Sequence, residues 1–408
     1  MTATARTPVL NINFMSPEVV ADPFPVYERI RLLGRCVYNG LADVWMVTGY
    51  DDAVAILRDP SRYSSRVLAD EKFGPWYDGA ATMLGSDPPD HDRLRSALRP
   101  CFTVRAVSRW EPLVRATVEE VFAALQEPLR DGEPIDMLTG VAFPLAALVT
   151  CRMLGVPESD SSQVIRWTHE MAVGSVAAVL ADTEPTAAAL YRNAVSAGRA
   201  LADYTRSRLA SEAPAEDSLL AHLLAAHRTG TLTRPEVVAT CVLLLLASTE
   251  TMAKLIANAI VLIAAHPDQR RALLADRSLT GAAVEEVIRF SGPAQFDPRT
   301  VTEDTAIGAV SLSPGETVWV LTAAAGRDPI RFPHPERFDI TRSPNQHLGF
   351  GHGIHLCLGA PLARVEARLA LEQLLSLVPD YVVTTVDYGQ SFFVRGPVRL
   401  EIARTGQD

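Results

Sequence analysis

The chain has 408 residues, of which 48% are hydrophobic and 21% are charged, so it contains enough apolar material for a large packed core. Its formal net charge of −10 argues against a nucleic-acid partner, because phosphate binding requires a basic face. The strongest apolar run, Val237 to Ala247, is too short to span a bilayer, which needs about 20 residues, and no signal peptide is evident. Five scattered cysteines, never in Cys-x-x-Cys spacing, indicate reduced thiols. We therefore expect a cytoplasmic protein that contacts neither nucleic acid nor membrane.

The first part of the chain is expected to carry a short helix and a small hairpin. Residues 1–20 are expected to form a loosely ordered extension. The apolar spacing of Pro25 to Leu33 predicts an amphipathic helix. Cys36 to Tyr38 and Val44 to Thr48 are predicted to pair as two strands around the turn signal Asn39-Gly40.

The middle of the chain is expected to be helical, because apolar residues recur there at the spacing of one helix face. The predicted helices are Thr117–Leu125, Ser161–Leu180, Pro185–Leu209, Pro235–Ala265 and Ala282–Phe290. Thr233, as N-cap, and Glu236, three residues on, open the fourth of these helices in the pattern of a capping box, which predicts where that helix begins.

After Pro293 the sequence changes in character, and short β-type runs alternate with prolines and glycines. Thr317 to Leu321 predicts a strand, Leu358 to Leu377 a last helix, and Tyr381 to Ile402 a β-like tail. No linker or internal repeat divides the chain. The predicted fold class is mainly α with minor β, a single domain over residues 1–408 with a helix-rich core and small sheets.

One cysteine lies where chemistry is expected. Cys357 stands between a glycine-rich loop and a helix in the segment FGHGIHLCLGAPLAR, residues 350–364. Free backbone N–H groups at such a junction lower a thiol pKa, and a thiolate bound to haem iron favours O–O cleavage. A buried structural cysteine is the ordinary alternative. Zinc is another, given His347, His352 and His355, although their spacing fits no common zinc pattern.

The segment FGHGIHLCLG resembles the haem loop of the cytochrome P450 family, F-G-x-G-x-H-x-C-x-G, without departure. Glu286-Val-Ile-Arg289 fits the family's E-x-x-R, and Pro335 to Phe338 fits its following meander. The resemblance implies a cytochrome P450-like fold, haem b as cofactor, Cys357 as the axial iron ligand, and a buried triad of Glu286, Arg289 and Arg337.

The resemblance also implies a set of haem-propionate ligands. The segment from Ser86 to Phe102 and the tripeptide Asp297-Pro-Arg299 fall where the family places them. A solvated basic helix face is the alternative for the first segment. Arginine suits this task because its planar fork meets a carboxylate through two hydrogen bonds. The residues implied are His91, Arg95, Arg299 and His355.

In the predicted central helix, the resemblance assigns proton delivery to Glu250 and Thr251, an acid and a hydroxyl that protonate bound oxygen. Ser248 departs from the family, which usually has glycine there. Its hydroxyl bonds back to a carbonyl one turn earlier, or it touches substrate or water. Lys254 is unusual in a helix expected to be buried, so it either pairs with Glu366 or extends to solvent.

The resemblance implies a monooxygenase that activates O2 and inserts one oxygen atom, by hydroxylation or epoxidation, into a small organic substrate. Electrons come from NAD(P)H through a separate ferredoxin reductase and ferredoxin. The ferredoxin is expected to dock on a basic patch. That patch comprises Arg95, Arg99, Arg105, Arg109 and Arg364. Oxidative coupling or ring closure without oxygen insertion is the alternative reaction, and a non-catalytic haem-binding module is the third.

By position in the family, a substrate pocket is expected to involve the 67–84 loop and a set of later residues. These are Ser248, Ala294, Gln295, Phe296, Phe393 and Val394. The polar side chains near it are few and the aromatic ones several. The former are Gln295, Ser248, Thr249 and Lys72, and the latter Phe73, Trp76, Tyr77, Phe296, Phe392 and Phe393. Such walls favour an aromatic or polycyclic secondary metabolite over a fatty acid.

Overall fold

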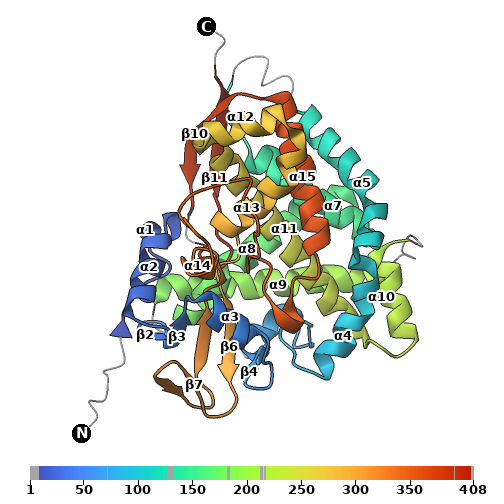
Figure 1. Ribbon diagram of the computed structural model, residues 1–408. Coiled ribbons are helices and arrows are strands. Elements are labelled where there is room, and N and C mark those ends of the chain that lie inside the picture. The colour runs from blue at the N-terminus through green and yellow to red at the C-terminus, as the bar shows by residue number, and fades with distance from the viewer. Residues whose placement is uncertain are drawn as a thin grey trace.

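The computed structural model describes residues 9–405, except residues 71, 126–132, 182–183, 212–214, 216 and 390 (Figure 1). Helices dominate it. They are α1 (Pro17–Ala21), α2 (Phe24–Leu33), α3 (Tyr50–Leu57), α4 (Asp90–Leu98), α5 (Val104–Ala123), α7 (Phe143–Leu154), α8 (Ser161–Leu180), α9 (Pro185–Ser211), α10 (Leu219–Arg228), α11 (Arg234–Ala265), α12 (Pro267–Ala275), α13 (Thr280–Ser291), α14 (Thr322–Ala325) and α15 (Ala360–Leu377). The mainly helical fold class is therefore confirmed.

The strands form small sheets at opposite ends of the molecule (Figure 1). The largest has the order β1 (Val9–Leu10), β2 (Val37–Asn39), β3 (Val44–Val47), β9 (Thr317–Val320), β6 (Asp297–Val301) and β4 (Tyr63–Ser64). The others are β10 (Tyr381–Asp387), β11 (Arg399–Arg404) and β5 (Ile135–Asp136), and the pair β7 (Thr305–Ile307) and β8 (Val310–Leu312). The antiparallel pair β2–β3 confirms the predicted hairpin.

The long helix α11 runs through the middle of the fold and contacts α7, α8, α9, α13 and α15. Its start follows the predicted capping box: Glu236 N–H donates to Thr233 Oγ1, and Thr233 N–H donates to the Glu236 carboxylate. By length and composition α11 could cross a membrane, because its apolar stretch continues well beyond Val237–Ala247. However, 72% of that stretch is buried within the protein, so α11 is the core helix of the fold.

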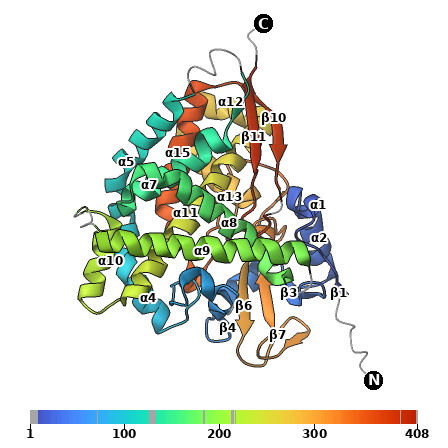
Figure 2. The ribbon, with the colours of Figure 1, turned by 180° about the vertical axis from the view of Figure 1, so that it is seen from behind.

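Helices α8 and α9 form a closely packed pair that covers one face of the molecule, where α9 crosses almost its full width (Figure 2). Small residues allow this approach. A Cβ at Gly174 of α8 would lie only 2.3 Å from the Ala194 Cβ of α9. Gly198, further along α9, lies close to the backbone of Trp76 in the short helix η2 (Gly74–Tyr77). The alanine-rich sequence of these helices therefore serves close packing.

Several elements differ from the sequence-based expectation. Helix α5 begins at Val104, capped by the Thr103 hydroxyl, and continues through Pro112, which breaks its apolar periodicity in the sequence. Residues of the expected loose extension instead form β1 and α1, while residues 1–8 lie outside the described part. Helices α4 and α7 were not predicted, since α4 is polar and α7 is apolar on most sides.

Lys254 is fully buried in α11 and neither of its expected arrangements occurs. Its ammonium donates to the Pro397 carbonyl at 2.7 Å and lies 5.1 Å from the centre of the Phe143 ring. No ion pair to Glu366 forms, and the side chain does not reach solvent. Gly396 makes room for the lysine, because a Cβ there would lie 2.6 Å from the Lys254 Cβ. The glycine beside Pro397 therefore fixes the position of the buried charge.

We predict that Gly396→Ala destabilises the protein by about 1–3 kcal/mol, the usual cost of overpacking a filled core. Denaturant-induced unfolding measures this change. Gly281→Ala is the matched control: Gly281 is exposed in α13 with nothing within 4 Å of the position that a methyl group would take, so this change should be neutral or stabilising by up to about 1 kcal/mol. Equal unfolding midpoints for the two variants would contradict the packing argument.

Candidate functional site

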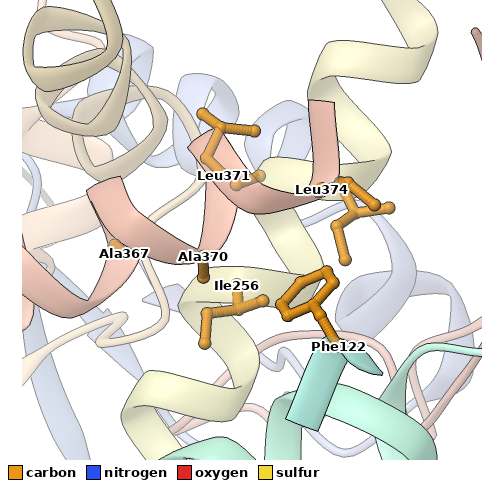
Figure 3. Close-up of a pocket in the computed structure, with 8 residues that line it drawn as sticks. Phe122, Ile256, Ala367, Ala370, Leu371 and Leu374 are labelled. Carbon is orange, nitrogen blue, oxygen red and sulfur yellow. The ribbon is translucent and has the colours of Figure 1, made fainter. Parts of the chain in front are cut away.

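Helix α11 is buried along most of its length, but one stripe of side chains near its middle is only partly covered. The stripe has helical spacing and consists of Leu244, Ala247, Ser248 and Thr251. In contrast, the apolar gap between α5, α11 and α15, lined by Phe122, Ile256 and Leu371, is filled by side chains (Figure 3). Its cavity of about 10 Å³ has room for no more than one water molecule. The partly covered stripe, and not this gap, indicates where a ligand meets α11.

The loop before α15 holds Cys357 in an accessible but recessed position. Cys357 N–H donates to the Phe350 carbonyl at 2.8 Å, closing a tight loop. Gly351 and Gly353 have φ values of +71° and +70°, in the left-handed region that favours glycine. At Gly353 a Cβ would also lie 2.1 Å from the Leu57 carbonyl oxygen of α3. Gly353 thus lets the loop pack closely against α3.

The electrostatics at Cys357 are only partly as predicted. Burial raises the pKa of the Cys357 thiol, while the N–H groups of Gly359 and Ala360 and the charges of Arg95 and Arg364 lower it. In the protein alone, burial has the larger effect. A bound metal cation would reverse this balance, because a coordinated thiol loses its proton. The surroundings therefore fit a thiolate that forms on metal binding.

The zinc alternative does not fit the geometry. His347 contacts Glu285, His352 accepts a hydrogen bond from Arg58, and His355 bonds to Ser65. Among the described residues, no group of three histidine, cysteine or acidic side chains is arranged to hold a metal ion. The three histidines thus serve different parts of the fold.

Basic side chains converge beside this loop, as predicted for a pair of carboxylates. The rings of His91 and His355 lie 4.6 Å apart, and Arg95 donates to the Leu356 carbonyl. Burial, together with the charges of Arg299, His91 and Arg95, lowers the pKa of His355 to about 3. Arg299 is buried, and no carboxylate in the described residues is within ion-pair distance of it.

One nitrogen of the His91 ring in this cluster has no hydrogen-bond partner in the described structure. Its Nδ1 faces Asp92, but its Nε2 is buried without a hydrogen-bond partner in the described structure. A buried polar atom without a partner costs free energy unless a ligand satisfies it. The cluster of His91, Arg95, Arg299 and His355 therefore fits the two propionates of a haem.

The predicted triad forms with a different third member. Arg289 and Glu286 make a fully buried bidentate ion pair at 2.7 Å. Arg342, not Arg337, adds the third side chain, at 3.3 Å from Glu286. Arg337 is exposed and contributes only its backbone carbonyl, which accepts from Arg289. The register of the meander turns the Arg337 side chain outward, which the motif did not reveal.

Ser248 uses its hydroxyl within the fold. It donates to the Leu244 carbonyl one turn earlier at 2.6 Å and accepts from Thr150 of α7 at 2.7 Å. The first of the two expected arrangements is therefore confirmed. The hydroxyl links α11 to α7.

The two predicted relay residues lie in different surroundings. Thr251 donates to the Ala247 carbonyl at 2.6 Å, on the partly covered stripe of α11. Glu250 is buried, and its carboxylate lies 3.1 Å from Nδ1 of His169 on α8. No sequence signal marks this contact, because His169 is 81 positions away and sits among ordinary helical residues.

Two of the six predicted substrate residues turn into the core. The Gln295 side chain is fully buried, accepts from Tyr27 at 2.8 Å and donates to the Gly292 carbonyl. Phe296 stacks on Trp319 with ring centres 4.1 Å apart. These contacts hold both side chains within the core.

Ala294 and Val394 pair in an isolated β-bridge, with Ala294 half-buried and Val394 buried. Phe393 is half-buried and packs edge-on against Phe296. Of the other aromatic candidates, most belong to the core, namely Trp76, Tyr77 and Phe392. Thr249 is likewise fully buried. Ala294 and Phe393 are thus the partly covered members of the predicted set outside α11.

The predicted basic patch is smaller than expected. Arg364 makes a bidentate ion pair with Glu285 at 2.8 and 3.0 Å. Burial raises the pKa of the Glu285 carboxyl, but the hydrogen bonds from His347 and Arg364 outweigh this effect and lower that pKa to about 2. The Arg364–Glu285 pair therefore stays ionised. Arg99, Arg105 and Arg109 remain exposed. The exposed apolar side chains Val104 and Leu356 accompany them.

Comparison with known proteins supports the same assignment. Residues 36–377 match the family model of cytochrome P450. The cytochrome P450 monooxygenase PikC of Streptomyces venezuelae is 38% identical over 92% of this chain and 89% of its own. The vitamin D(3) 25-hydroxylase of Pseudonocardia autotrophica is 34% identical over 93% of each chain. The solved structure of CxnD, a cytochrome P450 for C–S bond formation in chuangxinmycin biosynthesis, superposes with a TM-score of 0.86 at 26% identity, covering 99% of this chain and 100% of that one. This protein therefore belongs to the cytochrome P450 family of monooxygenases, whose cofactor is haem b bound through a thiolate.

Proposed function

We propose that Cys357 is the axial ligand of haem b and that the protein inserts one atom of O2 into a C–H or C=C bond of a hydrophobic organic substrate. The observation that carries this proposal is the Cys357 loop. Its thiol accepts hydrogen bonds from two backbone N–H groups. Beside it, in the described structure, His91 Nε2 is buried without a partner and no carboxylate lies within ion-pair distance of the buried Arg299. Haem, when bound, supplies the activation of dioxygen.

His91, Arg95, Arg299 and His355 would hold the haem propionates. Arg299 and His91 are the strongest members, because they are already buried and the propionates would offset part of their desolvation. The support for one domain over residues 1–408 is that α11 contacts elements drawn from most of the chain.

Glu250 and Thr251 would supply protons to oxygen. The Thr251 hydroxyl lies on the partly covered stripe of α11, where it can hold a water or donate a proton itself. Glu250, the preceding residue, is buried and would receive its own proton from outside the site.

The electrons would come from NAD(P)H through a ferredoxin reductase and a ferredoxin. Arg99, Arg105 and Arg109, with Val104 and Leu356, offer a basic surface with an apolar centre on the Cys357 side. Complementary charge speeds the encounter with an acidic partner. We place this chemistry in the cytoplasm, where the thiols stay reduced.

An aromatic or polycyclic secondary metabolite is the proposed substrate class. Phe393, Ala294 and the α11 stripe provide an apolar wall with few charges. A relative named for vitamin D(3) supports this class.

Oxidative coupling or ring closure without oxygen insertion is the second candidate, favoured by the similarity to CxnD, which forms a C–S bond. Product mass weighed against NAD(P)H consumed separates the candidates: insertion adds 16 mass units per turnover, coupling adds none, and a passive haem-binding module turns over neither substrate nor NAD(P)H.

The first prediction from the proposed function concerns Cys357. The reduced protein with carbon monoxide should show the strongly red-shifted Soret band of a thiolate-ligated haem. Cys357→His should lose this band and the oxygenase activity while it can still bind haem through imidazole. Cys101→Ser, which changes another partly exposed cysteine, is the control and should keep the band. An unchanged band in Cys357→His would remove Cys357 from the iron.

The second prediction concerns the proton relay. Thr251→Ala should bind substrate and consume NAD(P)H, but much of the oxygen should leave as hydrogen peroxide. Glu250→Gln should slow turnover by roughly 10²-fold, the usual size of a lost proton transfer. Product, peroxide and NAD(P)H are measured together. Unaltered yields in both variants would exclude this pair from the mechanism.

The third prediction concerns substrate class. A substrate-induced spin-state shift should occur with aromatic or polycyclic compounds and not only with long-chain fatty acids. Phe393→Ala should weaken the best ligand by roughly tenfold, since it removes a large apolar contact. Phe392→Leu, a change in the core behind it, should leave the dissociation constant nearly unchanged. A response to fatty acids alone would contradict the proposed class.

A further inference from the structure

The carboxylate of Glu250 points away from the partly covered stripe of α11 and towards α8. Its ion-pair partner in the described part of the chain is His169, with Glu250 Oε1 lying 3.1 Å from Nδ1. The two side chains differ sharply in exposure: 2% for Glu250 and 39% for His169. The His169 imidazole therefore contacts a buried carboxylate through Nδ1, while the side chain is partly exposed to solvent.

Phe143 of α7 holds this contact in place. Its ring meets the His169 ring edge-on, with centres 5.8 Å apart and an interplanar angle of 83°. Lys254 contacts the same ring, with its ammonium 5.1 Å from the Phe143 centre. One apolar ring thus packs against both the imidazole and the buried ammonium.

Lys254 lies one helical turn from Glu250. Its ammonium bonds to the Pro397 carbonyl, and within the described structure no carboxylate lies in ion-pair distance of it. Burial lowers the pKa of Lys254, and the charge of Glu250 opposes that effect. The charges that face Glu250 are therefore His169 from α8 and Lys254 from α11 itself. Arg166 and Glu170, the neighbours of His169 on α8, contact neither side chain in the described structure.

We infer that His169 is the entry point through which protons from solvent reach Glu250, and that it acts as a positioning residue for the reaction. This inference rests on the proposed function, because it extends the relay of Glu250 and Thr251 by one step outward. It depends on the contact of a buried acid with a partly exposed imidazole and on the ring that holds them together.

The proton transfer balances without any further reactant. Protonated His169 gives its Nδ1 proton to the Glu250 carboxylate, which becomes the neutral acid. The neutral imidazole keeps its Nε2 proton, and it recovers the lost proton at Nδ1 from water once the ring has turned that nitrogen towards solvent. Glu250 does not contact Thr251, whose hydroxyl donates to Ala247, so the acid delivers its proton by turning its side chain or through water. The observed geometry is thus the loading position of the relay.

The test compares two changes at one position. His169→Phe keeps an aromatic ring beside Phe143 but carries no proton, whereas His169→Lys restores a protonated donor opposite Glu250. In His169→Phe, product per NAD(P)H should fall at least threefold, peroxide should rise, and the solvent deuterium isotope effect on turnover should increase. His169→Lys should recover most of the product yield. Turnover driven by iodosylbenzene, which brings its own oxygen atom and needs no protons, should be the same in all three proteins.

Two further variants serve as controls. His334→Asn removes an exposed histidine far from α11 at a left-handed position that asparagine tolerates, and should change nothing. Glu250→Gln combined with His169→Phe should be no worse than Glu250→Gln alone, because His169 acts through Glu250. If Glu250→Gln lowers the product yield but His169→Phe does not, the entry point is wrong while the proposed relay stands. If neither does, both are wrong.

A measurement independent of turnover tests the access of solvent to His169 in the haem-loaded protein. Exchange of the histidine C2 proton for deuterium, read by mass spectrometry, should be as fast at His169 as at exposed His334 and much slower at buried His91. Exchange at His169 as slow as at His91 would overturn the inference, because a sealed imidazole cannot take up protons.

Discussion

The buried ion pair of Glu286 and Arg289 is the constraint on which the geometry of the site depends. Both side chains are wholly enclosed, and the Arg289 guanidinium also donates to the carbonyls of Gly326, Pro335 and Arg337. Glu286 in turn accepts from the backbone of Asp339 and the side chain of Asn345. One pair on α13 thereby fixes the irregular segment that leads to the Cys357 loop. Breaking such a pair strands a buried charge, which typically costs about 3–5 kcal/mol.

Helix α11 combines two roles that ordinarily conflict. It is the central helix of the core, yet Glu250, Lys254 and Asn258 follow one another at intervals of four along one face. Each of the three side chains contacts a distant segment: His169, the Pro397 carbonyl, and the carbonyls of Ser291 and Arg395. A core helix keeps such a row of polar side chains only at some cost in stability. At one end of this row stands Glu250, a residue proposed to move protons.

Sequence reasoning succeeded where the determinants are local. The capping box of α11, the span of α8 and the Cys357 loop are each specified by contiguous residues, and the structure has them as predicted. It failed where the outcome depends on register or long-range contact. Gln295 and Phe296 turned inward through contacts with Tyr27 and Trp319, which are distant in the sequence. Arg342 replaced Arg337 for a similar reason. The residues around Thr150 and His169 in the sequence do not indicate that these side chains contact Ser248 and Glu250 on α11.

The packing of Gly353 against Leu57 limits how this lineage can diverge. Any side chain at that position meets both a backbone oxygen of α3 and an unfavourable φ, whether or not the protein still performs chemistry. The glycine is therefore retained by folding as well as by cofactor binding, and a descendant that had lost its reaction would still carry it. Thr251 makes only a bond to its own helix, so it is free to drift once proton delivery is no longer selected. Loss of activity in a relative would thus be visible on α11 before it is visible in the cysteine loop.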